Sequence, residues 1–122
     1  MTYQPKALRP FVGAKDYQES REFYRALAFE EVILNDKMSL FKVSETLSFY
    51  LQDYYVEEWV NNSMVSLEVD DIAKCAAELQ GKNLQQQYKG VRFTEIKLQD
   101  WGKEFFMNDP SGVLWHFCEF NN

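Results

Sequence analysis

His116 is the only histidine in the chain and its most evident candidate for chemistry. A neutral imidazole can bind a metal ion, and an ordinary imidazole pKa of about 6.5 suits general acid–base catalysis near neutral pH. A catalytic histidine also needs a partner, for which Tyr50 is the candidate. A lone histidine on a strand is more often a hydrogen-bonded residue of a core or cleft, so that alternative stands beside the catalytic one.

The stretch around His116 predicts a closing β-hairpin within residues 98–120. Apolar runs at 105–107 and 113–117 flank a short turn sequence. The turn reads Asp-Pro-Ser-Gly from Asp109 onward. Its proline fixes φ, its aspartate can hydrogen-bond the following backbone, and its glycine is conformationally permissive. An apolar run, a turn of this chemistry and a second apolar run are typical of a hairpin.

Composition excludes several classes of function. The net charge of −6 and the absence of a basic cluster argue against a nucleic-acid partner. No apolar run reaches the length that crosses a membrane, and no leader pattern is visible at the N-terminus. Cys75 and Cys118 lie in apolar contexts, so we expect reduced core cysteines in a cytoplasmic protein. Aromatic residues make up 16% of the chain, enough to predict that some of them line a cavity or an interface.

The first half of the chain predicts a β-α-β-β-β module over about residues 6–52. An apolar run at 6–14 predicts its first strand, with Pro10 placing that strand at an edge or a bulge. Asp16 is a good N-cap for the helix that follows. Alternating or apolar segments then predict three strands, at 29–35, 38–43 and 46–52.

The same order of elements begins again after a polar and aromatic connector at 53–62. Residues 64–69 alternate in polarity and predict a strand. Asp71 can cap the helix that follows, and Gly81 is a candidate for the end of this helix. The connector is therefore the join between two similar halves.

The remaining residues complete a second module over about 64–120. We predict a loop at 83–93, where no pattern is visible, then a strand at 95–99 and the closing hairpin. In each module a helix buries one face of a sheet. The chain is therefore predicted to be one α+β domain, residues 1–122, with two tandem β-α-β-β-β modules whose sheets curl around a cleft.

Several short motifs follow one another in a familiar order. The helix segment KDYQESREFYRALAFEEV matches a D-x-x-x-S-x-x-F-Y-x-x-L pattern at Asp16, Ser20, Phe23, Tyr24 and Leu27, with Phe29 two residues on. Val69-Asp70-Asp71-Ile72, Trp101-Gly102 and Asp109-Pro110-Ser111-Gly112 follow in the second half. Together they resemble the glyoxalase / bleomycin-resistance / extradiol-dioxygenase superfamily. Its fold is called vicinal oxygen chelate and is also that of dihydroxybiphenyl dioxygenase.

Enzymes of this superfamily usually hold a divalent metal with His, Gln or Glu at four strand positions, two in each module. The resemblance places these positions at Arg9, Tyr50, Met64 and His116. A guanidinium cannot bind a cation, a tyrosine is a poor ligand unless deprotonated, and a thioether does not suit hard or borderline metals. The resemblance therefore implies neither a metal site nor another cofactor.

The metal-free members are typified by bleomycin-resistance proteins, small acidic homodimers that sequester a bulky, cationic, aromatic drug. This chain resembles them at residues 98–102 and in lacking the ligand set, which implies that Trp101 lines a binding groove. We therefore expect a metal-free small-molecule-binding homodimer with a bulky aromatic or cationic ligand and a role such as antibiotic resistance. The expected ligand-binding residues are Trp101, Tyr50, His116, Met64, Phe11, Gln52 and Arg9.

Two other functions remain open at this point. The first is a lyase, an isomerase or another enzyme of the superfamily, either metal-dependent or using His116 and Tyr50, although the missing ligand set argues against a metal enzyme. The second is a structural or regulatory dimer without a small ligand. In that case Tyr54, Tyr55 and Trp59 would fill the cleft or pack against a partner subunit.

Overall fold

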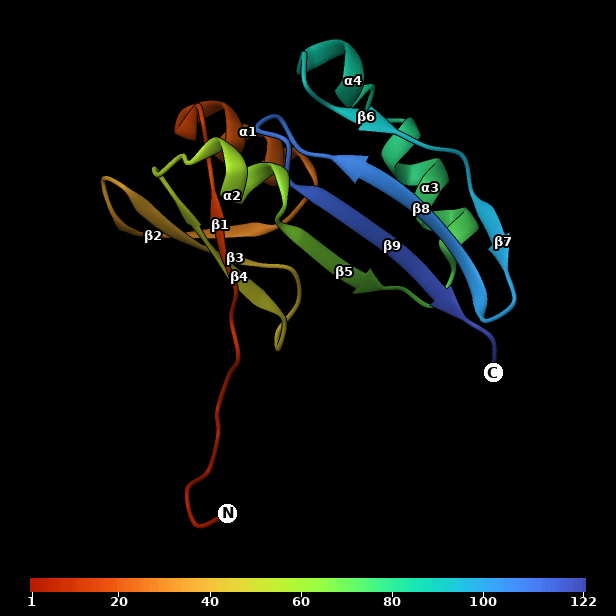
Figure 1. Cartoon of the computed structure of the whole chain (residues 1–122), viewed down its shortest axis with the longest axis horizontal. Coiled ribbons are helices and arrows are strands. Elements are labelled where there is room, and N and C mark those ends of the chain that lie inside the picture. The colour runs from red at the N-terminus through yellow and green to blue at the C-terminus, as the bar shows by residue number, and fades with distance from the viewer.

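Two sheets stand side by side in the computed structural model, which describes residues 1–122 (Figure 1). The N-terminal sheet has the strand order β1-β4-β3-β2, and the C-terminal sheet has the order β5-β9-β8-β6, with β7 also paired to β8. The first four strands are β1 (Phe11–Gly13), β2 (Glu30–Asn35), β3 (Met38–Lys42) and β4 (Ser48–Gln52). The other strands are β5 (Met64–Glu68), β6 (Arg92–Phe93), β7 (Lys97–Gln99), β8 (Gly102–Asn108) and β9 (Leu114–Phe120).

Both sheets are built in the same way, which confirms the predicted α+β fold of two similar modules. In each module the first strand pairs in parallel with the last, β1 with β4 and β5 with β9. Tyr50 thereby lies opposite Phe11, and His116 lies opposite Ser66. One face of each sheet is buried in the core, and the residues that alternate with the core residues point to the other, free face.

The two main helices begin where the sequence predicts. In α1 (Tyr17–Ala26) the Asp16 side chain accepts a hydrogen bond from the Glu19 backbone N–H at 3.1 Å. In α3 (Ile72–Gln80) Asp71 caps in the same way, and Gly81 forms the C-cap. These short N-caps satisfy backbone donors that have no partner within the helix. None of the helices is long and apolar enough to cross a membrane.

The first strand is shorter than the predicted 6–14, since β1 begins only at Phe11. The prediction is wrong for the residues before it. Pro10 has no backbone N–H, so it offers the sheet only its carbonyl, which accepts from the Tyr50 N–H at 2.9 Å. Residues 1–10 are all exposed and run away from the body of the molecule, at the lower end of Figure 1. Leu8 is 97% exposed.

The connector and the predicted 83–93 loop both contain regular structure. The connector at 53–62 includes α2 (Glu57–Asn61), whose Val60 is fully buried. The 83–93 segment contains α4 (Leu84–Gln87), anchored by the buried Leu84, and then β6. Leu84 is the only buried residue of α4, and one apolar residue in a polar stretch gives no periodic signal. The helix α2 has five residues, too few for its two apolar residues, Trp59 and Val60, to form a helical pattern. The predicted 95–99 strand is also shorter, since β7 begins at Lys97.

Asp109 organises the turn of the closing hairpin, as the sequence predicts. The Asp109 side chain also connects this turn to the core. The Asp109 Oδ1 atom accepts hydrogen bonds from the N–H groups of the next residues, Ser111, Gly112 and Val113, each at 2.9 Å. Its Oδ2 atom accepts from the Tyr24 hydroxyl at 2.5 Å. The Trp115 indole N–H in turn donates to the Tyr24 oxygen at 2.9 Å.

This network joins the two modules, because Tyr24 belongs to α1 and the other two residues belong to the C-terminal hairpin. Tyr24, Asp109 and Trp115 are each at most 1% exposed. Burial raises the pKa of the Asp109 carboxyl to about 6, against the opposing effect of hydrogen bonds from Tyr24 and the backbone. Burial and the nearby carboxyl raise the pKa of Tyr24 as well, so its hydroxyl stays protonated and donates.

Tyr24→Phe is expected to lower the free energy of unfolding by about 1–3 kcal/mol, since it leaves a buried carboxylate oxygen and a buried indole N–H without partners. Urea denaturation measures this change. Tyr54→Phe is the matched control, because Tyr54 is exposed and its hydroxyl has no hydrogen bond, and it should change stability by less than about 0.5 kcal/mol. Equal stability of wild type and Tyr24→Phe would contradict the importance of the network.

A second prediction concerns pH and Asp109→Asn. Because the folded pKa of about 6 lies above the unfolded one, the folded state gains stability from the protonated carboxyl. That gain is fully present below the unfolded pKa of about 3.9 and is lost as pH rises through the folded one. The free energy of unfolding of wild type minus that of Asp109→Asn should therefore fall by roughly 2–3 kcal/mol between pH 4 and 7. A difference that grows with pH would contradict the raised pKa.

Candidate functional site

An open cavity of about 350 Å³ lies on the free face of the C-terminal sheet. We call it the C-terminal cavity; it is lined by Met64, Ser66, Trp101, Glu104, His116, Cys118 and Phe120. Side chains alternate along a strand, so residues two apart on β5 and β9 point to the same face. The cavity is therefore formed by the sheet that the closing hairpin completes.

Two aromatic rings form one wall of the C-terminal cavity. Trp101 and Phe120 lie with ring centroids 5.2 Å apart at an interplanar angle of 50°, and they are 41% and 49% exposed. The chain is held closely behind them, because a Cβ at Gly102 would lie 2.1 Å from the Glu119 carbonyl oxygen. Asn121 also donates its backbone N–H to the Trp101 carbonyl at 2.9 Å. The indole is thus presented from a fixed backbone.

The cavity contains a carboxylate without a cationic partner. Gln99 donates its side-chain amide to Glu104 Oε1 at 3.1 Å. Both ion pairs of the chain involve Glu31, which binds Arg21 and Arg25 far from this sheet face. Glu104 therefore has no ion pair, and it stands in a cavity that is otherwise largely apolar. Such a carboxylate favours a positively charged ligand.

His116 contacts a sulfur atom rather than an acid or a base. Its Nε2 atom lies 3.3 Å from the Met64 Sδ atom. The imidazole also packs edge-on against Phe106, with ring centroids 4.6 Å apart. The expected partner Tyr50 lies on the other sheet and makes no contact with His116, so the chain holds no assembled acid–base pair at this position.

Four of the expected site residues gather on the free face of the N-terminal sheet instead. Phe11 and Tyr50 pack with ring centroids 4.8 Å apart. The Arg9 guanidinium lies 5.9 Å above the Tyr50 ring and donates from Nε to the Ser48 hydroxyl at 2.8 Å. Gln52 lies on the same strand face, two residues beyond Tyr50. Within one chain, no contact joins this group to the C-terminal cavity.

The structure therefore brings together three of the seven expected residues, Met64, Trp101 and His116, around one cavity. The rest of the lining is Ser66, Glu104, Cys118 and Phe120, and Glu104, Cys118 and Phe120 were not predicted. The alternation along the last strand contains the signal for two of them, because His116, Cys118 and Phe120 fall on one face. Glu104 becomes recognisable only once β8 is paired with β9 and its face is known.

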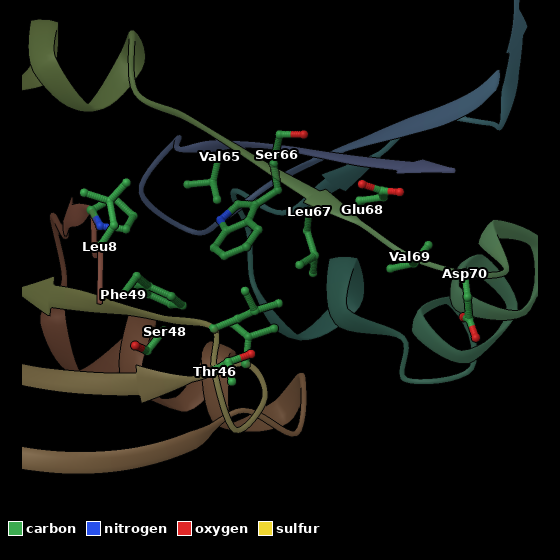
Figure 2. A pocket seen from close by; sticks show the side chains of 14 residues that line it. Leu8, Thr46, Ser48, Phe49, Val65, Ser66, Leu67, Glu68, Val69 and Asp70 are labelled. Carbon is green, nitrogen blue, oxygen red and sulfur yellow. The ribbon is translucent and has the colours of Figure 1, made fainter. Parts of the chain in front are cut away.

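A second cavity, of about 580 Å³, lies between the two modules, and we call it the intermodule crevice. Figure 2 shows Val65 and Leu67 of β5 pointing toward Phe49 of β4, while Ser66 points the other way. Glu68 and Asp70 are its acidic lining residues. None of the seven expected residues lines this crevice, so the two cavities can be tested separately.

The residues present do not fit the divalent metal that enzymes of the resembled superfamily usually hold. No three His, Cys, Asp or Glu side chains are grouped so that they could hold a metal ion. The four corresponding positions form two separate pairs, Arg9 with Tyr50 on one sheet and Met64 with His116 on the other, and the Arg9 guanidinium carries a positive charge. These residues therefore do not form a site for such a metal.

Comparison with solved structures shows the fold. A bleomycin-binding protein from Streptomyces verticillus, complexed with copper(II)-bleomycin, is 18% identical with a TM-score of 0.80, over 98% of this chain and 100% of that one. TnmS3, an antibiotic-binding protein from Streptomyces sp. CB03234, is 18% identical with a TM-score of 0.75, over 99% of each chain. A lactoylglutathione lyase from Agrobacterium tumefaciens is 16% identical with a TM-score of 0.70, over 96% of each chain.

The chain therefore has the glyoxalase/bleomycin-resistance fold that the sequence motifs predicted. We find no matching family model and no matching curated protein. Because the same fold occurs in binding proteins and in a lyase, the function has to be inferred from the residues of the site.

Tag-free protein is expected to bind no stoichiometric Ni²⁺, Zn²⁺ or Mn²⁺, because the chain offers these ions no cluster of three suitable ligands. Isothermal titration, followed by metal analysis of the desalted protein, measures this. About one equivalent of any of the three ions retained after desalting would contradict the prediction.

Proposed function

We propose that this protein is a small-molecule-binding protein that sequesters a bulky, cationic, aromatic ligand in the C-terminal cavity, without a catalytic divalent metal. In this proposal the chain is one domain of two modules, and two copies form a homodimer. The protein acts in the cytoplasm and binds neither nucleic acid nor membrane. Protection against a toxic antibiotic is the role that such a protein would serve. The solved structures with this fold include bleomycin-binding and antibiotic-binding proteins, which supports the proposal.

The unpaired Glu104 carboxylate beside the Trp101–Phe120 aromatic wall is the observation that carries the proposal. Flat aromatic groups stack on indole and phenyl rings, and a cation is attracted both by these ring faces and by the carboxylate. The net charge of −6 attracts cationic ligands from a distance. A volume of about 350 Å³ is at the lower end of the range for ligand sites, which fits a shared site that one chain only half encloses.

A second copy of the chain would complete the enclosure. The free face of the N-terminal sheet presents Arg9, Phe11 and Tyr50, and the Phe11 side chain is 49% exposed. In the dimer, this face of one protomer covers the C-terminal cavity of its partner. All seven expected residues then surround one ligand, although they form two separate groups within a single chain.

The two other functions have less support. An enzyme using His116 lacks a bonded acid or base, because the imidazole nitrogen faces the Met64 thioether. A structural dimer with a self-filled cleft would need the connector aromatics in the cavity. Tyr54 and Trp59 instead pack against each other, with centroids 5.9 Å apart, and they do not line the C-terminal cavity.

Metal-free bleomycin is the probe for the ligand-binding prediction. At one hundred times its dissociation constant, it should stabilise the protein by about 2.7 kcal/mol, which raises the midpoint of thermal unfolding measurably. Trp101→Ala should abolish the shift, because the stacking wall is lost, without lowering the stability of the free protein. Glu104→Gln should weaken binding by about tenfold, since it removes the charge and keeps the shape.

Leu47→Trp is the matched control for these variants, because Leu47 lines the intermodule crevice and is half exposed. It should leave the thermal shift unchanged. A shift that survives in Trp101→Ala and disappears in Leu47→Trp would place the ligand in the crevice and contradict the proposed site.

At low micromolar concentration the protein is expected to sediment as a dimer, at twice the chain mass of 14.5 kDa. The physical reason is burial of the exposed aromatic residues on both free sheet faces. Analytical ultracentrifugation measures the mass. A monomer at these concentrations, with full affinity for the ligand, would show that one chain suffices for the site.

A further inference from the structure

Two opposite charges lie across from each other at the C-terminal cavity without forming an ion pair. β7 and β8 pair so that Lys97 is directly opposite Glu104, and side chains at such positions point to the same face of a sheet. Glu104 lines the cavity, and Lys97 belongs to the exposed strand beside it. Both ion pairs of the chain are nevertheless made by Glu31. The ammonium of Lys97 and the carboxylate of Glu104 are therefore both available to a ligand.

A neutral neighbour holds each of these charges. The Lys97 Nζ atom lies 5.9 Å from the centre of the Phe106 ring. Gln99 donates its side-chain amide to Glu104 Oε1 at 3.1 Å. In the register of β7 and β8, Phe106 and Gln99 lie at diagonal positions on opposite sides of the Lys97–Glu104 pair. Lys97 thus leans in one direction along the strands and Glu104 leans in the other, so the two charged groups diverge.

The aromatic wall of the cavity lies on the other side of Glu104 from this ammonium. Phe120 of the wall is opposite Gly102 on β9, two residues before Glu104 on β8, and Phe106 is two residues after it. Residues two apart on a strand share one face. Along β8 this face therefore presents first the aromatic wall, then the Glu104 carboxylate and then the Lys97 ammonium above Phe106. A ligand that lies along β8 meets the three groups in this order.

We propose that the C-terminal cavity takes a zwitterionic aromatic ligand, whose cationic group pairs with Glu104 and whose anionic group, such as a carboxylate, pairs with Lys97. A ligand with positive charge alone leaves the Lys97 ammonium beside a second cation, and this repulsion weakens binding. Lys97 loses little when it turns to the ligand, because a cation–π contact at an exposed site is weak. This inference rests on the proposed function and specifies the chemical class of its ligand.

Rhodamine 110 and rhodamine 123 are the matched probes for this inference. Both dyes contain the same flat cationic ring system, but rhodamine 110 has a free carboxylate, which is a methyl ester in rhodamine 123. Titration of each dye with the protein, followed by fluorescence anisotropy, gives the two dissociation constants. The wild type should bind rhodamine 110 about threefold more tightly, which is the size of effect that a partly exposed ion pair produces.

Variants assign the preference to one side chain. Lys97→Gln should bind the two dyes with equal affinity, whereas Lys97→Arg should keep the preference for rhodamine 110. Lys103→Gln is the matched control, because Lys103 is an exposed lysine next to Glu104 whose side chain points to the other face of the sheet. It removes the same charge from the protein and should leave the preference unchanged. Glu104→Gln should weaken the binding of both dyes, since both contain the cationic ring system.

Equal affinity of the wild type for the two dyes would overturn the inference and leave the proposed function intact, because rhodamine 123 is itself an aromatic cation. A preference for rhodamine 110 that survives in Lys97→Gln would overturn it as well, since another group would then recognise the carboxylate. If neither dye binds, the inference is also overturned, and the thermal shift with metal-free bleomycin decides separately on the proposed function.

Discussion

The hydrogen-bond network of Tyr24, Asp109 and Trp115 is the constraint on which the rest of the structure depends. It places one ionisable carboxyl at the centre of the molecule, where burial disfavours its charge and four donors surround it. The tyrosine hydroxyl connects the helix of one module to the hairpin turn of the other. Neighbouring contacts add to this connection, since Ser20 and the Lys15 N–H both bond the Ser111 hydroxyl in the same turn. The two sheets are therefore joined at their cores rather than through their free faces.

This construction leaves the free faces available for binding. The turn at Asp109 fixes where β9 begins and thereby its register with β5 and β8. Because a one-residue change of register would exchange the two faces, the same turn decides that Trp115 is buried and His116 faces the cavity. The cavity itself combines an aromatic wall with a Glu104 carboxylate that has no ion pair. These groups suit a bulky aromatic cation and suit hard divalent metals poorly.

Much of the fold could be predicted from the sequence, because local signals and overall architecture agree. Asp16, Asp71 and the turn at Asp109 act locally, through hydrogen bonds to backbone only two to four residues away. The same carboxyl of Asp109 also has a partner 85 residues distant, which no local pattern reveals. The grouping of the site was harder to predict, since strand alternation gives the face of a residue and not its neighbours across the sheet. Trp101 was recognised through a motif, whereas Glu104 depends on a pairing that only the structure shows.

The three tryptophan residues allow the most direct test of the central claim, that the ligand binds in the C-terminal cavity. Trp101 lies at that cavity, Trp115 lines the intermodule crevice, and Trp59 lies in α2. In a ¹H–¹⁵N NMR titration with metal-free bleomycin, we expect the Trp101 indole N–H signal to move to saturation while the other two stay in place. Movement of the Trp115 signal with the Trp101 signal unchanged would contradict the account and place the ligand between the modules.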